Sequence, residues 1–89
     1  MNVPINEVNT TLRLMRELQN LSQTEVAKRA DTRQASVSFV EVNKGDSTLG
    51  TIAKIAKALG YETFINFVKI KESNNPKQNQ NESFESTAA

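Results

Sequence analysis

The fold is decided by residues 21–49, LSQTEVAKRADTRQASVSFVEVNKGDSTL. This stretch predicts two short helices joined by a tight turn, and the second helix keeps polar side chains on the face that it does not bury. Such a layout allows a small domain to place one helix in the major groove of DNA. The rest of the chain mainly decides what else the domain binds.

Local signals mark the ends of both helices. The capping box SQTE at residues 22–25 predicts the start of a helix that runs to about Ala30. Asp31 is expected in a left-handed turn, and Thr32 is expected to cap the second helix, over residues 33–42. The inward-facing residues of the two helices are predicted to be Val26, Ala27, Ala30, Val37 and Val40, with Ala35 as a further candidate.

Amphipathic helices are predicted on both sides of this core stretch. The first covers residues 5–19 and ends at Asn20, and the last begins at Ser47 or Thr48 and ends at the C-cap Gly60. The apolar stripe of the first helix is Ile5, Val8, Leu12, Met15 and Leu18. That of the last helix is Leu49, Ile52, Ile55, Ala56 and Leu59.

Beyond Gly60 the pattern changes to β-branched and aromatic residues, which predicts a strand over residues 61–70. A lone strand has unpaired edges, and the sequence offers no second strand. The simplest partner is the same strand of another copy, with Phe64, Ile65, Phe67, Val68 and Ile70 at the dimer contact. The polar residues 71–89 are expected to form a disordered tail. We therefore expect one domain over residues 1–70, mainly α, with four to five helices and one C-terminal β-strand that pairs across a homodimer.

Composition excludes several classes of function. The 89-residue chain contains no cysteine and no histidine, so disulfides, thiolate metal sites and histidine-based nucleophile activation are absent. Neither an enzyme activity nor a metal nor a cofactor is expected. No apolar run approaches a membrane span and the N-terminus is unlike a signal peptide, which predicts a cytoplasmic protein. The net charge is only +1, but basic side chains outnumber acidic ones between Arg13 and Lys57.

Residues 9–60 resemble the Xre, or lambda-repressor-like, family of helix-turn-helix DNA-binding proteins. The motifs are LSQTEVAKRA, RQASVSFVEVNKG and STLGTIAKIAKALG. Within the family the chain looks most like the Hip-type (HipB-like) antitoxins, because of the segment RQASVSFVE and the strand after Gly60. HigA-like antitoxins are the second choice.

This resemblance implies a DNA-binding set of residues. Gln23 matches a glutamine that anchors the DNA backbone at a helix N-terminus, and Gln34 matches a base-reading position, where an amide pairs with adenine N6 and N7. Phe39 departs from the polar family pattern, so it faces DNA, turns inward or lies at a partner surface. Each residue taken singly is also compatible with ordinary helix surface. The complete predicted DNA-binding set is Gln23, Arg33, Gln34, Ala35, Ser36, Ser38, Phe39 and Lys44.

The family also pairs an arginine of the first helix with a glutamate of the third. Here these positions are Arg16 and Glu41, and the resemblance implies an ion pair that holds the two helices together. Glu41 as a catalytic acid is the alternative, which nothing else in the chain supports.

The resemblance implies a homodimeric transcriptional repressor of operator DNA in the bacterial nucleoid. It would be the antitoxin of a type II toxin–antitoxin system, repressing its own operon and neutralising a HipA-like kinase toxin or, as second choice, a HigB-like ribonuclease. The alternatives are a phage or host Xre-type regulator without a toxin, and an interaction module that has lost DNA binding. In the tail, Phe84 suggests a partner anchor and the Ala88–Ala89 ending suggests a protease signal.

Overall fold

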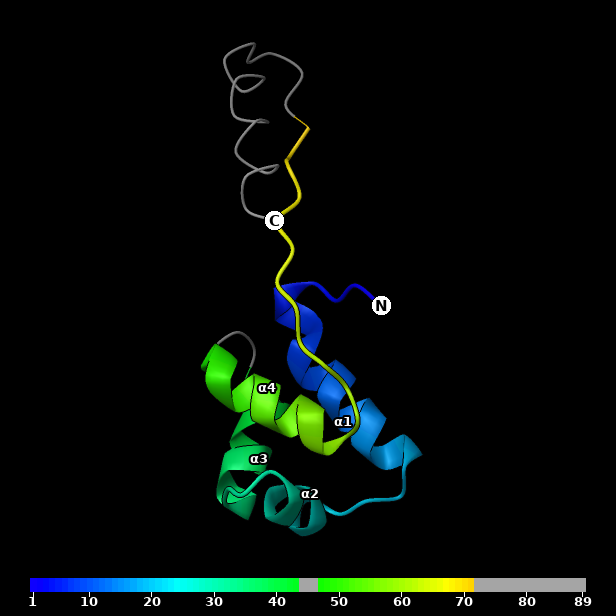
Figure 1. Ribbon diagram of the computed structural model, residues 1–89, viewed down its shortest axis with the longest axis vertical. Helices are drawn as coiled ribbons and strands as arrows, with labels where there is room; N and C mark the ends of the chain where they lie inside the picture. Colours follow the sequence, from blue (N-terminus) through cyan, green and yellow to red (C-terminus); the bar gives the residue numbers. More distant parts are fainter. Residues whose placement is uncertain (44–46, 72–89) are drawn as a thin grey trace.

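The computed structural model describes residues 1–43 and 47–71. Its elements are the 3-10 helix η1 (Ile5–Glu7) and the helices α1 (Val8–Leu18), α2 (Gln23–Arg29), α3 (Gln34–Val42) and α4 (Leu49–Ala58). Figure 1 shows α2 and α3 together at one end of the helical body, and the N-terminus toward the other end. The mainly helical architecture agrees with the sequence prediction.

The first predicted helix is divided into η1 and α1. Its opening turn is tightened, because the backbone N–H groups of Glu7 and Val8 donate to the carbonyls of Pro4 and Ile5. Proline has no N–H to donate, so it is compatible with this position ahead of a helical turn. The predicted start at Ile5 is therefore correct as a helical turn, whereas the α-helical geometry begins at Val8.

Three helices end with the same left-handed motif. Asn20, Asp31 and Gly60 have φ values of 57°, 56° and 93°. Each comes directly after the C-cap residue of its helix, which is the position of the left-handed residue in a Schellman motif. After α2, for example, Asp31 N–H donates to Lys28 O and Thr32 N–H donates to Ala27 O. The left-handed turn expected at Asp31 and the stops at Asn20 and Gly60 are thus confirmed.

The predicted cap of the third helix is wrong by one residue. Arg33, not Thr32, is the N-cap of α3, and its side chain makes no capping hydrogen bond. The physical reason is that the Thr32 amide completes the motif that ends α2. The chain then needs one extended residue before it can turn into α3.

The capping box of α2 is present in full. Ser22 Oγ accepts from Glu25 N–H at 3.0 Å, and Glu25 Oε1 accepts from Ser22 N–H at 2.8 Å. This confirms the sequence prediction.

Acid is expected to weaken this cap. The backbone hydrogen bond from Ser22, followed by the Ser22 hydroxyl, lowers the pKa of Glu25 below its ordinary value of 4.5. A carboxylate with a lowered folded-state pKa stabilises the fold above its unfolded pKa and loses that contribution as the pH falls through its folded pKa. Glu25→Gln should therefore flatten the pH dependence of the unfolding free energy below about pH 4.5. Urea unfolding followed by circular dichroism across this range checks it, and an unchanged acid slope in the variant would contradict it.

The core lies where α1, α2, α3 and α4 meet. Its largest fully buried side chains are Val26, Val37, Val40 and Ile55, all of which the sequence places on inward faces. The predicted stripe of the first helix is only partly buried. Leu12 lies in the core, but Ile5 and Leu18 are 71% and 73% exposed, because no other described element covers the two ends of that helix.

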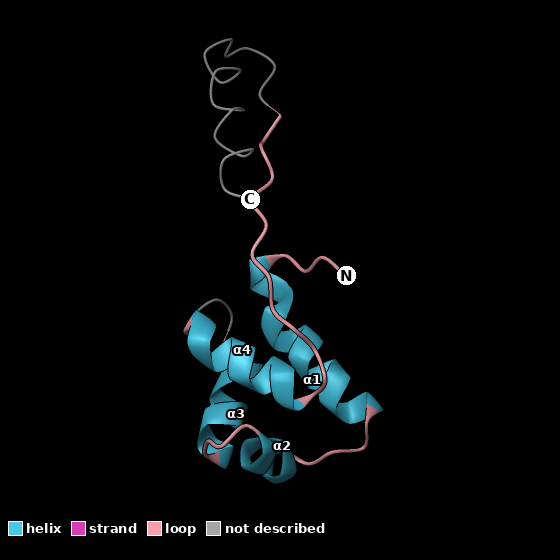
Figure 2. Ribbon diagram, in the orientation of Figure 1, coloured by secondary structure: helices cyan, strands magenta, loops and turns pink. Residues whose placement is uncertain are grey.

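The segment 61–71 leaves α4 and runs beyond the helical body as an extended trace (Figure 1). Figure 2 shows no strand in the described part of the chain, so the predicted strand does not form within one molecule. All residues of this segment are exposed, with Phe64 and Phe67 at 84% and 86%. None of the described helices has the length and apolar character needed to cross a membrane.

Candidate nucleic-acid interface

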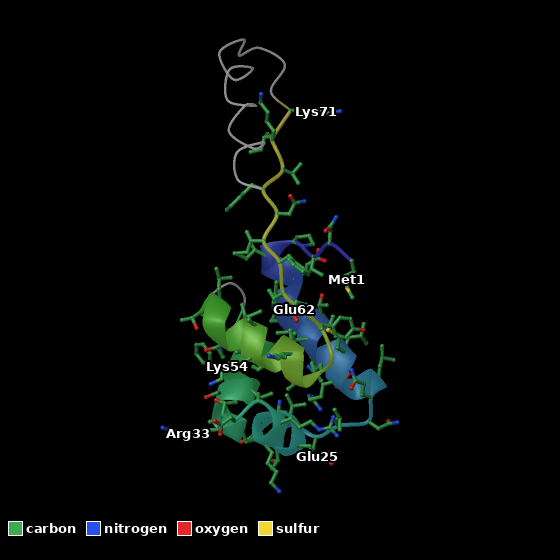
Figure 3. The ribbon with its side chains drawn as sticks, in the orientation of Figure 1. Met1, Glu25, Arg33, Lys54, Glu62 and Lys71 are labelled. Carbon is green, nitrogen blue, oxygen red and sulfur yellow. The ribbon has the colours of Figure 1, made fainter. Side chains whose placement is uncertain are left out.

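The exposed face of α3 carries most of the predicted DNA-binding residues. Arg33, Gln34 and Ala35 are exposed at the N-terminal end of the helix, and Figure 3 shows Arg33 pointing away from the body. Phe39 is 49% exposed, so it does not turn into the core. Ser36 and Ser38 are half-buried on the flanks of this face.

A buried ion pair holds α3 against α1. Arg16 Nε and Nη2 donate to the two carboxylate oxygens of Glu41 at 2.7 and 3.0 Å, the arrangement that the sequence analysis expected. The side chains are 13% and 3% exposed. The Glu41 hydrogen bond is the largest cause that raises the pKa of Arg16 above its ordinary value. Arg16 Nη1 also donates to the Leu21 carbonyl at 2.9 Å, which ties the start of the helix-turn-helix unit to the same guanidinium.

Two glutamines extend this pair to the protein surface. Gln23 Nε2 donates to Glu41 Oε1 at 3.0 Å, and Gln34 Nε2 donates to Gln23 Oε1 at 2.6 Å. We call the chain Arg16–Glu41–Gln23–Gln34 the polar relay. It begins on α1, inside the molecule, and ends on the exposed first turn of α3.

The polar relay leaves both glutamines able to contact a ligand. A primary amide has two N–H donors and one carbonyl acceptor. Gln34 uses one N–H for Gln23, so its carbonyl and second N–H remain for the bidentate contact that adenine offers in the major groove. Gln23 uses its carbonyl and one N–H, so one N–H remains for a phosphate oxygen.

A groove of about 350 Å³ lies beside this face, between α3 and the start of α4. Thr48 caps α4 by accepting from Thr51 N–H at 3.2 Å. The groove is lined by Arg33, Ala35, Ser36, Phe39, Val40, Ser47, Thr48 and Thr51.

Ser47, Thr48 and Thr51 were missed as members of this surface by the sequence analysis. Ser47 and Thr48 were predicted only as possible starts of the last helix, because a start signal is local and does not show which helix lies opposite. Lys44, the remaining predicted DNA contact, lies outside the described residues. Across the described parts of the chain, no cluster of acidic residues forms a candidate metal site.

Comparison with known proteins agrees with the helical fold. The family model described as Helix-turn-helix matches residues 12–65. A chain from the solved structure of a HipA-HipB-O2-O3 complex is 26% identical, with a TM-score of 0.67, and the match covers 78% of this chain and 97% of that chain. A structure described as MDT Protein matches with the same values. No curated protein gives a significant match. Because the family model spans more than half of the sequence, from α1 to the C-terminal segment, this chain belongs to the helix-turn-helix family.

Proposed function

We propose that the protein is a sequence-specific DNA-binding repressor and the antitoxin of a type II toxin–antitoxin system, with a HipA-like kinase toxin as its partner. The observation that carries the DNA-binding part is the polar relay, which presents Gln34 on an exposed helix end from a buried anchor. A side chain whose position is fixed before binding loses less conformational entropy when it meets its target. The family assignment supports a regulator rather than an enzyme.

In this proposal α3 lies in the major groove and Gln34 reads adenine. Ala35 contacts a thymine methyl, Phe39 packs on neighbouring thymine methyls, and Ser36 and Ser38 bind base edges or phosphates. Arg33 binds a phosphate or a guanine. Gln23 donates to a phosphate beside the N-terminus of α2, and Lys44 contributes a further phosphate contact.

The protein acts as a homodimer in this proposal. Helix-turn-helix dimers bind half-sites about 34–36 Å apart, and the extended apolar segment 61–71 supplies a surface that one molecule leaves uncovered. Antiparallel pairing of two such segments satisfies the edge groups of both.

The toxin partner is supported by the 26% identical chain from a complex that contains HipA and HipB. Co-expression with the product of the neighbouring gene tests this part. Co-purification with a HipA-like kinase supports it, whereas a HigB-like ribonuclease or the lack of a toxin gene favours the alternatives. Toxin binding without any DNA binding would identify an interaction module.

Gln34→Ala tests the DNA-binding part. Loss of one bidentate base contact costs about 1–3 kcal/mol, so affinity for DNA from upstream of its own gene should fall about 5- to 150-fold. Fluorescence anisotropy with a labelled duplex, at two or more salt concentrations, measures this effect and the expected steep salt dependence. The matched control is Asn6→Ala, which removes an exposed amide from η1. Unchanged affinity in Gln34→Ala would refute the assigned role of Gln34.

A further inference from the structure

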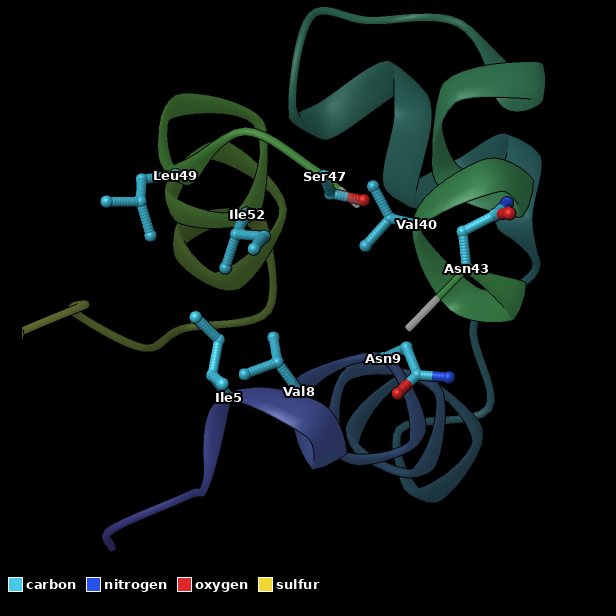
Figure 4. Close-up of a pocket in the computed structure, with 8 residues that line it drawn as sticks. All are labelled: Ile5, Val8, Asn9, Val40, Asn43, Ser47, Leu49 and Ile52. Atoms are coloured by element: carbon cyan, nitrogen blue, oxygen red, sulfur yellow. The ribbon is translucent and has the colours of Figure 1, made fainter. Parts of the chain in front are cut away.

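A cavity of about 30 Å³ lies between η1, α1, α3 and the N-terminal part of α4 with the residues that lead into it (Figure 4). Apolar side chains from these elements form most of its wall, including Val8, Val40 and Ile52. Three polar residues, Asn9, Asn43 and Ser47, also line it. The cavity is therefore mainly apolar, with polar groups from α1, from the end of α3 and from the residues that lead into α4.

The Asn43 amide donates to the Phe39 carbonyl at 2.8 Å, whereas Asn9 and Ser47 each carry a buried polar atom with no hydrogen-bond partner in the described structure. The atoms are Asn9 Oδ1 and Ser47 Oγ. Asn9 is 8% exposed, and its Nδ2 donates to the Glu41 backbone carbonyl at 3.3 Å. This bond fixes which way the amide faces, so rotation of the side chain cannot exchange the unpaired oxygen for a donor without breaking it. An unsatisfied buried acceptor is costly and rare in native proteins.

We propose that one ordered water molecule occupies this cavity and bridges Asn9 Oδ1 and Ser47 Oγ. The chamber is large enough, because a buried water needs at least about 10–15 Å³ and two to four polar partners. One water hydrogen donates to Asn9 Oδ1, an atom that can only accept. The water bonds to the Ser47 hydroxyl as donor or acceptor, since a hydroxyl can do both.

This water joins α1 to the segment that enters α4. Asn9 already binds the carbonyl of Glu41, whose carboxylate anchors the polar relay. The bridge thus completes a second set of polar contacts between α1 and the elements beside the candidate interface. It does not depend on whether the protein binds DNA.

A crystal structure of the full chain, at a resolution that shows ordered water, tests the proposal directly. The expected result is a density peak within hydrogen-bond distance of both Asn9 Oδ1 and Ser47 Oγ. A cavity without such a peak would overturn the proposal, and so would a direct hydrogen bond between the Ser47 hydroxyl and another protein atom.

A double-mutant cycle with Asn9→Leu and Ser47→Ala gives an independent test in solution. Loss of the bridge should lower the folding equilibrium constant about fivefold in Ser47→Ala. In the Asn9→Leu background the bridge is already lost, so adding Ser47→Ala should change the folding equilibrium constant little. Both variants that carry Asn9→Leu lack the hydrogen bond to the Glu41 carbonyl, so this loss cancels when the two are compared. Ser36→Ala, outside this cavity, is the control and should act independently of Asn9→Leu. Additive effects of Asn9→Leu and Ser47→Ala would refute the bridge.

Discussion

Arg16→Met is expected to lower the unfolding free energy by about 3–5 kcal/mol, as the removal of one partner from a buried ion pair typically does. The carboxylate of Glu41 would remain 3% exposed with only the Gln23 amide as a side-chain partner. The Leu21 carbonyl would also lose its guanidinium donor. Because small domains are stable by only about 5–15 kcal/mol, much of the fold's stability would be lost.

The chain provides a matched control in a second arginine–glutamate pair on α1. Arg13 Nε lies 3.1 Å from Glu17 Oε2, but the two side chains are 58% and 49% exposed. Exposed pairs contribute about 0.2–1 kcal/mol, so Arg13→Met should have a small effect. Urea unfolding followed by circular dichroism measures both variants at one protein concentration, because the proposed dimerisation would make apparent stability depend on concentration. Equal losses in the two variants would show that burial of the Arg16–Glu41 pair contributes nothing.

A double variant distinguishes the cost of leaving the Glu41 carboxylate unpaired from the loss of the contact that anchors the polar relay on α1. Arg16→Met with Glu41→Gln leaves no unpaired ion, so it should recover part of the stability lost in Arg16→Met alone. The polar relay would still lack its anchor on α1. Weak DNA binding by this double variant, measured where it is folded, is therefore expected even when stability is largely restored.

Local features of the fold could be predicted from the sequence because they depend on neighbouring residues. The capping box at Ser22 and Glu25 and the left-handed turns at Asp31 and Gly60 need only a few adjacent residues. Val37 and Val40 were predicted inward by helical spacing and are buried. The predicted burial of Ile5 and Leu18 is wrong. Whether residues at the ends of a helix are buried depends on which other element covers them, and helical periodicity carries no such information.

The candidate interface was predicted only as a set of separate positions. The sequence and the family resemblance pointed to Gln23, Gln34 and Glu41, each with its own role. In the structure, Gln23 of α2 hydrogen-bonds both Gln34 and Glu41, which lie at opposite ends of α3. Residue spacing along the sequence cannot specify such a contact among three side chains. The groove between α3 and α4 was missed for the same reason.

Proline substitutions in the segment 61–71 are expected to have the largest effect on DNA binding. A strand that pairs with a second copy needs the N–H groups on its paired edge, and proline has none. Consecutive N–H groups along a strand point to opposite edges, so the variant Asn66→Pro/Phe67→Pro removes a donor from the paired edge whatever the register. This variant should be monomeric by sedimentation or light scattering, and its helical circular dichroism should be unchanged, since the segment lies outside the helical body.

The consequence for DNA follows from the linkage of two half-site contacts. When one half of a dimer is bound, the other is held near its half-site at high effective concentration, which raises the overall affinity by about 10²–10⁴-fold. The double-proline variant should lose most of this gain on a duplex with two half-sites, and little on a duplex with one. The controls Asn66→Thr and Phe67→Val keep both N–H groups and favour extended backbone, so they should remain dimeric. A double-proline variant that stays dimeric would show that another surface, and not strand pairing, joins the two copies.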